Sequence, residues 1–386
     1  MFKERLEVKV LSKVLYEILN YRVSLDVAFK RACKGLCKLS LQEREELYLK
    51  TRSFISDFIK VKCVVGEKKS YGKYVRAWLK GVNTEGLPDW CYLSINEWFY
   101  LRLVGLLGRD ETRSLVKAFE DRVWWLRINT LKNSEERILK SLENEGVEYV
   151  VDKEYPYLIK VIKSRKPIRL LKAVKNYELI PQDKASVAVV EALKPEPGDL
   201  ILDMAFAPGI KTSLIMMLTD NKAKVVATDV SFRRALTGKH LLTKYGVDLS
   251  RLNIVAMDAR DSQFSKAFDK VLLDAPCSNS GAVSKDPGLK ITLTSSKVNH
   301  YSKTQKELLQ KALKLGEVVV YSTCSLMPEE GEEVVETVGD VIKLKKVINW
   351  GATGYRNFKH AEYLTRLFPH KHNTEGFFIA YIIPKN

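Results

Sequence analysis

Two cysteines follow predicted strands in the second half of the chain, in positions suited to thiol chemistry. Cys324 lies in Tyr321-Ser322-Thr323-Cys324-Ser325, after an apolar run that predicts a short buried strand. Cys277 lies in Asp274-Ala275-Pro276-Cys277-Ser278, after a second run of this kind. Because open α/β sheets bind ligands at the carboxyl ends of their strands, both thiols are predicted to face one pocket. The alternative is that each cysteine is a small buried apolar residue.

A pair of thiols at such a position can bind a metal, form a disulfide or react with a substrate. A metal site needs more ligands than these two, and a disulfide is disfavoured in a reducing cytoplasm. Methylation of a pyrimidine at carbon 5 fits better, because a thiolate must first add to carbon 6 and a base must later remove the carbon 5 proton. Asp274 would stabilise the adduct near ring nitrogen 3. Methylation of an exocyclic amine needs no covalent thiol.

An earlier loop of small residues joins a predicted strand to a predicted helix and is suited to binding a cofactor. Small residues let the backbone approach a ligand, and the following helix N-terminus favours an anion. The loop matches neither the dinucleotide nor the phosphate-loop fingerprint, which favours a carboxylate ligand over a polyphosphate. Its residues are Ala205, Phe206, Ala207, Pro208, Gly209, Ile210 and Lys211.

Four aspartates stand at or near the ends of successive predicted strands: Asp203, Asp229, Asp258 and Asp274. One such aspartate can be a helix cap, but four in register favour a cofactor site. Asp229 is suited to both hydroxyls of a ribose, and Asp258 to an adenine amino group. A carboxylate, a ribose and an adenine together indicate S-adenosylmethionine.

The chain is predicted to hold three parts. Residues 1–110 show apolar residues at helical spacing and predict a compact helical bundle. Residues 111–180 predict a small α/β unit that begins with a strand at 124–130. Residues 181–386 alternate strand and helix, which is typical of a doubly wound parallel sheet.

Local signals predict where several helices of the bundle begin. Ser24 is predicted to cap the second helix. The spacings Ser40 to Glu43 and Ser94 to Glu97 both match a capping box, in which side chain and backbone of the two residues exchange hydrogen bonds.

The composition indicates a soluble protein with an anionic partner. The net charge of +17 predicts salt-dependent binding to nucleic acid, or else a solvated basic surface. The basic stretch 163–175 allows the same two interpretations. No apolar run predicts a membrane span, and the start of the chain does not predict a secretory signal.

The six cysteines are not expected to form a disulfide framework, and a reducing cytoplasm is predicted. Cys33 and Cys37 lack further ligands at metal spacing, so no metal is expected. No oligomeric state is predicted.

Beyond these inferences, the motifs resemble those of the Sun/Fmu (RsmB-like) family of RNA cytosine-5 methyltransferases. The resemblance covers about residues 120–386 and rests on the following stretches: 127–132, 181–186, 202–212, 274–278, 321–330 and 366–378. It implies a Rossmann-like methyltransferase domain with S-adenosylmethionine as cofactor. Residues 1–110 are similar in pattern to the NusB-like RNA-binding domain that precedes some members.

The resemblance also implies roles for single residues. Cys324 would be the nucleophile, and Cys277 would assist proton removal or product release. Asp274 would contact both cytosine and cofactor. The loop from Ala205 to Lys211, together with Asp229, Arg234 and Asp258, would bind S-adenosylmethionine. The substrate would be ribosomal or transfer RNA.

The chain departs from the family pattern at a few positions. Ala205, Phe206 and Ile210 replace the usual cysteine, alanine and glycine, and a positive φ at Ile210 would cost about 1 kcal/mol or more. Asn279 replaces a glycine and Gly331 an asparagine. These departures leave a second hypothesis, a non-catalytic RNA-binding or ribosome-assembly factor that keeps the fold. A DNA methyltransferase is a more distant third. Neither His370 nor His372 is assigned a role.

Overall fold

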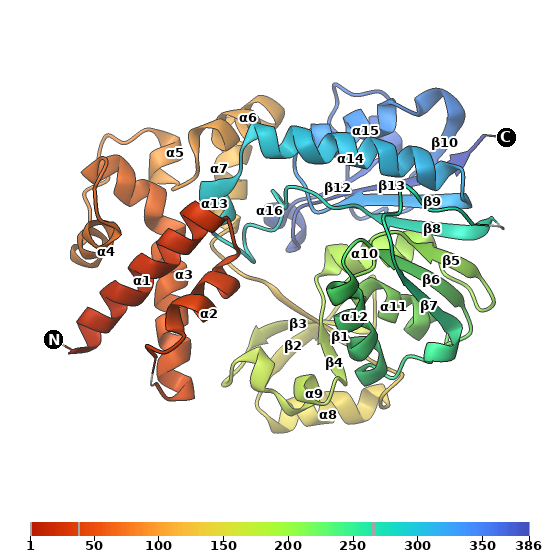
Figure 1. Ribbon diagram of the computed structural model, residues 1–386, viewed down its shortest axis with the longest axis horizontal. Helices are drawn as coiled ribbons and strands as arrows, with labels where there is room; N and C mark the ends of the chain where they lie inside the picture. The colour runs from red at the N-terminus through yellow and green to blue at the C-terminus, as the bar shows by residue number, and fades with distance from the viewer. Residues whose placement is uncertain (1, 38, 265–266, 386) are drawn as a thin grey trace. The chain divides into compact units, whose positions relative to one another are not determined.

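The protein forms two compact units in the computed structural model, which describes residues 2–37, 39–264 and 267–385 (Figure 1). The helical unit comprises residues 1–122 and 279–298. The sheet unit comprises residues 123–278 and 299–386. The division of the chain into 1–110, 111–180 and 181–386 stays a prediction.

The helical unit is built around an apolar core to which its first four helices contribute. The capping box at Ser40 is confirmed, since both of its hydrogen bonds are present. The box predicted at Ser94 is wrong, because Asn96 caps that helix by accepting from Phe99 N, while Ser94 Oγ accepts from Lys60 N. The helices are α1 (Phe2–Tyr21), α2 (Leu25–Cys33), α3 (Leu41–Val65), α4 (Tyr71–Lys80), α5 (Asp89–Tyr92), α6 (Glu97–Leu107), α7 (Arg109–Ala118) and α13 (Leu289–Thr292).

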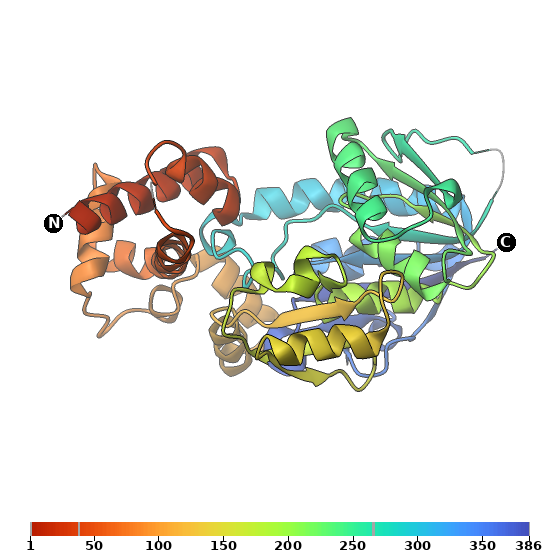
Figure 2. The ribbon, with the colours of Figure 1, turned by 90° about the horizontal axis from the view of Figure 1, so that it is seen from below.

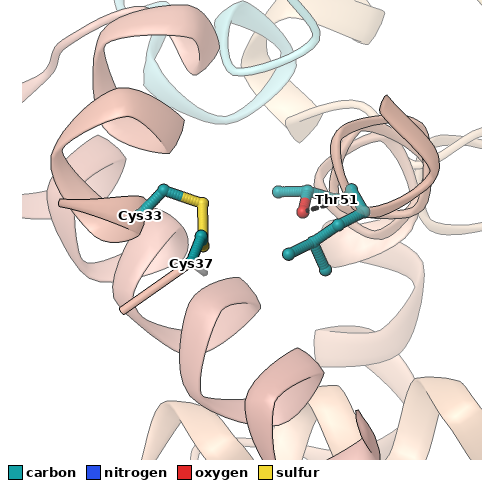
Figure 3. The surroundings of a disulfide bond; sticks show 4 residues. Cys33, Cys37 and Thr51 are labelled. Atoms are coloured by element: carbon teal, nitrogen blue, oxygen red, sulfur yellow. Dashed lines mark hydrogen bonds between the residues drawn. A yellow bond between two sulfur atoms is a disulfide. The ribbon is translucent and has the colours of Figure 1, made fainter. Parts of the chain in front are cut away.

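Two disulfides lie in the helical unit, so the expectation that the cysteines form no disulfides is wrong there. Cys33 bonds to Cys37 where α2 ends, opposite Thr51 of α3 (Figure 3). Cys63 of α3 bonds to Cys91 of α5. The first pair is local and the second is brought together by helix packing, which cysteine spacing alone does not reveal.

A small antiparallel sheet opens the sheet unit, with strand order β2-β3-β1-β4. Helix α8 packs on it through Ile138 and Leu142 (yellow in Figure 2). Its elements are β1 (Trp124–Ile128), α8 (Glu135–Asn144), β2 (Glu148–Val151), β3 (Leu158–Lys163), η1 (Ile168–Leu170), α9 (Lys172–Lys175) and β4 (Leu179–Pro181).

The large sheet has a parallel centre, as predicted, and an antiparallel side that the sequence analysis did not predict. Strands β7, β6, β5, β8 and β9 run parallel in that order, and β13, β12 and β11 continue the sheet antiparallel, with β10 paired to β13 (Figure 1). The strands are β5 (Leu200–Asp203), β6 (Lys224–Asp229), β7 (Leu252–Ala256), β8 (Phe268–Asp274), β9 (Gly316–Thr323), β10 (Ile342–Lys345), β11 (Ala352–Thr353), β12 (Thr365–Leu367) and β13 (Phe377–Pro384).

Both faces of the large sheet are buried, which explains why its strands are continuous apolar runs. Successive residues of β9 alternate between the two cores: Val320 packs with α10 and α11, whereas Val319 and Tyr321 pack with α14 and α15. The helices and turns are α10 (Lys184–Leu193), α11 (Ile210–Leu218), α12 (Phe232–Lys244), η2 (Leu249–Arg251), α14 (Ser295–Leu313), η3 (Pro328–Glu330), α15 (Glu332–Glu336), η4 (Gly339–Val341), η5 (Ala361–Tyr363) and α16 (Pro369–His372).

Across residues 2–37, 39–264 and 267–385, no helix is both long and apolar enough to cross a bilayer. In the same ranges, no three His, Cys, Asp or Glu side chains gather as a metal site.

Candidate active site

The ends of β8 and β9 bring the two predicted cysteines together. These strands are parallel neighbours, with Asp274 opposite Ser322, so the residues that follow them emerge at one edge of the sheet. The Sγ atoms of Cys277 and Cys324 lie 3.0 Å apart. Both remain thiols, Cys277 buried and Cys324 partly exposed. Two thiols in contact can act on one substrate atom or on its neighbour.

A lysine and an aspartate stand beside the thiols as an ion pair. Lys211 Nζ, at the start of α11, lies 2.6 Å from Asp274 Oδ2. Asp274 Oδ1 accepts a second hydrogen bond, 2.8 Å long, from Ser322 Oγ on β9. Burial is the largest single effect and lowers the pKa of Lys211, but the charge and hydrogen bond of Asp274, with the charges of Cys324 and Asp203, together outweigh it, so the pKa is raised. Lys211 therefore stays a cation near Cys324.

A fully buried carboxylate, Glu330, ties the two cysteine motifs together. It accepts hydrogen bonds from the Ser278 amide at 2.7 Å, from the Ser278 hydroxyl, and from the Ser325 hydroxyl at 2.6 Å. Gln305 Nε2 of α14 donates to Glu330 Oε1 at 3.3 Å and to the Pro276 carbonyl at 2.8 Å. Burial raises the pKa of Glu330, and these hydrogen bonds oppose that rise.

The sequence analysis did not single out Glu330 as a site residue. The only signal was its place in Pro328-Glu329-Glu330, a stretch that was used for the resemblance and not for chemistry. A carboxylate six residues after a cysteine carries no signal of burial, so its role depends on the turn η3.

Next to Glu330, a buried ion pair explains one departure from the family pattern. Arg366 and Glu332 pair with both side chains fully buried, and Arg366 also donates to the Ser325 carbonyl at 2.6 Å. A Cβ atom on Gly331 would lie 2.6 Å from Arg366 Nη2 and 2.8 Å from the Phe378 ring. Gly331 is therefore required by close packing and not by a positive φ.

The loop after β5 accommodates its unusual residues. Its positive φ, +92°, lies at Gly209, and Ile210 is the first residue of α11, so the predicted backbone cost at Ile210 does not arise. The ring of Phe206 lies against two glycines, because a Cβ on either Gly209 or Gly238 of α12 would approach it to 2.6 Å. Gly238 thus makes room for Phe206. Asn279 has a φ of 62°, as its tolerance of left-handed geometry predicts.

The four aspartates stand where they were expected, but they have different partners. Asp203 is fully buried and accepts from the Thr212 hydroxyl at 2.6 Å, and burial raises its pKa to about 6. It therefore supports the loop from within. Asp229 accepts from the amides of Ala207 and Ser231. Asp258 accepts from the guanidinium of Arg260 at 2.7 Å.

Arg234 of α12 lies beside Asp229 and the loop. Its Nη1 is 3.5 Å from the Asp229 carboxylate, and its Nη2 donates to the Ala207 carbonyl at 2.7 Å. Arg234 thereby fixes the loop to the end of β6. The carboxylates of Asp229, Asp258 and Asp274, with the α11 N-terminus among them, suit a ligand that carries hydroxyls, amino groups and a carboxylate.

Arg127, in one of the stretches behind the resemblance, is a structural residue. It is fully buried and donates to Gln182 Oε1 at 2.7 Å and to the Ser213 hydroxyl of α11 at 2.6 Å. It therefore connects β1 to the helix that carries Lys211. His372 also has a structural environment, since its Nδ1 accepts from Phe368 N and burial lowers its pKa to about 4.

Each of the two units has a basic surface. In the helical unit, a cleft of about 690 Å³ between α1 and the start of α4 is lined by the cations Arg5, Lys9, Lys69 and Arg76, with Glu4 as its one acid. In the sheet unit, the basic residues of 163–175 are all exposed. Within that stretch, Lys166 pairs with Glu145 at 3.0 Å.

Comparison with known proteins agrees with this arrangement. The family model described as "16S rRNA methyltransferase RsmB/F" matches residues 190–383. A "28S rRNA (cytosine(4447)-C(5))-methyltransferase" from Homo sapiens is 32% identical over 310 residues, which are 75% of this chain and 38% of that protein. The chain thus spans well under half of that relative's length.

A shorter relative is matched over more of its own length, and a solved structure is matched over nearly all of both chains. A "tRNA (cytosine(49)-C(5))-methyltransferase" from Pyrococcus abyssi is 36% identical over 219 residues, 53% of this chain and 70% of that protein. The crystal structure of the protein PH0851 superposes with a TM-score of 0.81 over 98% of both chains, at 24% identity. The second likeness extends the shared fold to the helical unit.

Proposed function

The chain belongs to the RsmB/F family of 16S rRNA methyltransferases, and we propose that it is an S-adenosylmethionine-dependent RNA cytosine-5 methyltransferase. The observation that carries the proposal is the contact between the thiols of Cys277 and Cys324 beside the Lys211–Asp274 ion pair. Transfer to carbon 5 needs a nucleophile and a base close together, and this pair of thiols supplies both.

We assign the nucleophile to Cys324. Its charge acts on Lys211, so the ammonium is near enough to stabilise a thiolate there. Cys277 lies instead beside Ser278, whose amide and hydroxyl bind the Glu330 carboxylate. Cys277, whose Sγ lies 3.0 Å from that of Cys324, is then the group in place to assist removal of the carbon 5 proton.

The proposed steps balance as follows. The Cys324 thiolate adds to carbon 6 of the cytosine, forming the S–C6 bond, and the C5=C6 electron pair moves to carbon 5. S-adenosylmethionine, when bound, would supply the electrophilic methyl group that carbon 5 takes up, and its sulfur would keep the electron pair of the broken S–CH3 bond. Cys277 assists removal of the carbon 5 proton, the C–H electron pair restores the C5=C6 bond, and the Cys324 thiolate leaves with its own pair. Asp274 would hold the cytosine at ring nitrogen 3.

The cofactor would be held by the loop and strand ends already described. Asp229 would accept from the ribose hydroxyls, Asp258 from the adenine amino group, and the α11 N-terminus would take the carboxylate. Arg234 would keep the loop against Asp229, and Lys211 would orient Asp274. The departures that raised the non-catalytic alternative are accommodated by Gly209, Gly238 and Gly331, so no contact favours that alternative.

RNA is the proposed substrate, ribosomal or transfer. The cleft between α1 and α4 and the exposed stretch 163–175 offer cations to phosphates, which supports a role in RNA binding for the helical unit and the small sheet. A NusB-like character of the helical unit belongs to the same proposal. We further propose a cytoplasmic protein, since intracellular disulfides do occur in hyperthermophiles.

The test is to incubate the full chain with total RNA and methyl-labelled S-adenosylmethionine and then to digest the RNA to nucleosides. Label in 5-methylcytidine supports the proposal. Label in another nucleoside contradicts the assignment of carbon 5. Calorimetric binding of the cofactor with no labelled nucleoside, from RNA and from ribosomal particles alike, would favour the non-catalytic alternative.

A further inference from the structure

Residues 279–298, which we call the strap, leave the sheet unit immediately after the Cys277 motif and belong to the helical unit. The chain then returns through α14, a continuous helix of 19 residues. RNA binding alone would not require the helical unit to include a segment from the second half of the chain. The contacts of the strap within the helical unit indicate what it does there.

The strongest contact is a buried ion pair at Lys290. The Lys290 side chain is 0% exposed, and its ammonium bonds to Glu120 and, at 3.1 Å, to the Ser56 hydroxyl of α3. The Ser56 hydroxyl donates in turn to Glu120 at 2.7 Å. A lysine without charge partners is rarely buried, so this site holds the strap at one defined position.

Two further contacts hold the first half of the strap. Arg52 of α3 donates to the carbonyls of Ser284 and, at 3.1 Å, Lys285. Asp286 accepts from the amide of Leu25, the first residue of α2, at 3.2 Å. These three hydrogen bonds join the strap to α2 and α3, two helices near the start of the sequence.

The second half is held by Asn96 and by the apolar core. The Asn96 amide donates to the Lys290 carbonyl at 3.1 Å, and its side chain donates to the Leu293 carbonyl at 3.0 Å. Ile291 packs against the core formed by the first four helices. The strap is therefore held in the helical unit from Ser284 to Leu293.

Both ends of the strap lead to the same carboxylate in the sheet unit. Ser278, one residue before the strap, donates to Glu330 through its amide and hydroxyl. Gln305 of α14, seven residues after the end of the strap, donates to Glu330 and to the carbonyl of Pro276, next to Cys277. The strap thus continues directly from the Cys277 motif at one end, and at the other end the helix that follows it reaches Pro276 through the side chain of Gln305.

We propose that Lys290 is a positioning residue for Cys277: through the strap, the helical unit sets the position of the second thiol while leaving Cys324 on its own strand. This rests on the proposed function, and specifically on the role of Cys277 in resolving the covalent complex. Glu330 holds both cysteine motifs, but the chain enters the helical unit directly after Ser278, whereas the chain after Cys324 stays in the sheet unit. Release of the RNA should therefore depend on Lys290 more than attack does.

The test is Lys290→Met in the full chain, assayed with total RNA and methyl-labelled S-adenosylmethionine. We expect turnover to fall about ten-fold or more, with the KM for the cofactor unchanged. After denaturation, labelled RNA should remain linked to the protein, as it should for Cys277→Ala. A purely structural defect would lower product and linked RNA together.

The matched control is Lys50→Met, which removes a different lysine ion pair of the helical unit, with Glu7, that has no contact with the strap. Its turnover should equal that of the wild type. If Lys290→Met does not fold, Glu120→Gln removes the charge at a side chain that is 49% exposed, and it should leave linked RNA in smaller amounts.

The outcomes separate the two proposals. Product from the wild type, linked RNA with Cys277→Ala and wild-type behaviour of both Lys290→Met and Glu120→Gln would overturn the role of the strap alone. No 5-methylcytidine from the wild type would overturn the proposed function and the role of the strap with it. Linked RNA from Lys290→Met and none from Lys50→Met supports both.

Discussion

The cysteines of the sheet unit and those of the helical unit have opposite surroundings. Cys277 and Cys324 remain thiols at the polar ends of two strands, beside Lys211, Asp274 and Glu330. The four cysteines of the helical unit form disulfides next to an apolar core. The same residue type is thus a free thiol in one unit and part of a disulfide in the other, and we propose that the charges and hydrogen-bond donors around the free pair make it reactive.

Removing the cation from the thiol site should have the largest effect. Lys211→Met leaves the partly exposed Asp274 without its ion-pair partner and takes the ammonium away from Cys324, so we expect kcat/KM to fall about a thousand-fold, or about 4 kcal/mol. Lys270→Met is the matched control, since its side chain is equally exposed at 15% and pairs with Asp199 at the other end of the strands. Equal losses in both variants would contradict a specific role for Lys211.

Opening a disulfide should affect stability and leave the chemistry intact. Replacing Cys63 and Cys91 together by alanine removes a cross-link between residues 28 apart, which should lower the free energy of unfolding by about 3–4 kcal/mol. Opening the Cys33–Cys37 pair, only 4 apart, should cost about 2 kcal/mol. Thermal melting measures both. A large loss of turnover below the melting temperature would show that the helical cysteines also serve catalysis.

The buried carboxylate of Asp203 should make stability depend on pH. Its pKa is raised to about 6 in the folded protein, above about 3.9 in the unfolded chain, so the stability it contributes is present below about pH 4 and is lost as the pH rises through 6. Asp203→Asn should remove up to about 2–3 kcal/mol of this dependence. Unfolding of wild type and variant is compared from pH 4 to 7.5. Parallel curves would contradict the assignment.

Of the four changes, a mild substitution at Glu330 should have the smallest effect in free energy. Glu330→Gln keeps the volume but replaces one acceptor oxygen with a donor, so the Ser278 and Ser325 hydroxyls must rotate, and we expect about a ten-fold loss of kcat. Glu336→Gln of α15 is the control. Among the described hydrogen bonds, the Glu336 side chain accepts one, from the backbone amide of Lys359, 23 residues later in the sequence. If kcat stayed the same and only the KM for the cofactor rose, Glu330 would act on cofactor binding and not on the thiols.

Sequence reasoning succeeded where chemistry follows directly from position along a strand. Apolar runs that end in Asp274 and Thr323 predicted adjacent strand ends, and the thiols that follow them are in contact. Lys211 and Asp274 were both predicted as site residues, but their pairing was not, since it depends on how the start of α11 and the end of β8 come together in the fold.

Other features depend on tertiary packing and carry no local signal. The Cys63–Cys91 disulfide joins residues of two helices, and the antiparallel strands after β9 have no spacing that sets them apart from the parallel ones. The capping box at Ser94 failed because Asn96, two residues later, is an equally good cap. The positions of Glu330 and of the strap are defined by hydrogen-bond partners that lie far away in the sequence.

The most direct test of the account compares wild type, Cys324→Ala and Cys277→Ala with total RNA and methyl-labelled S-adenosylmethionine, counting 5-methylcytidine and protein-linked RNA. The account predicts neither product nor linked RNA from Cys324→Ala, and linked RNA with little released product from Cys277→Ala. Product from Cys324→Ala, or linked RNA that persists without Cys324, would contradict the assignment of the nucleophile and with it the central claim.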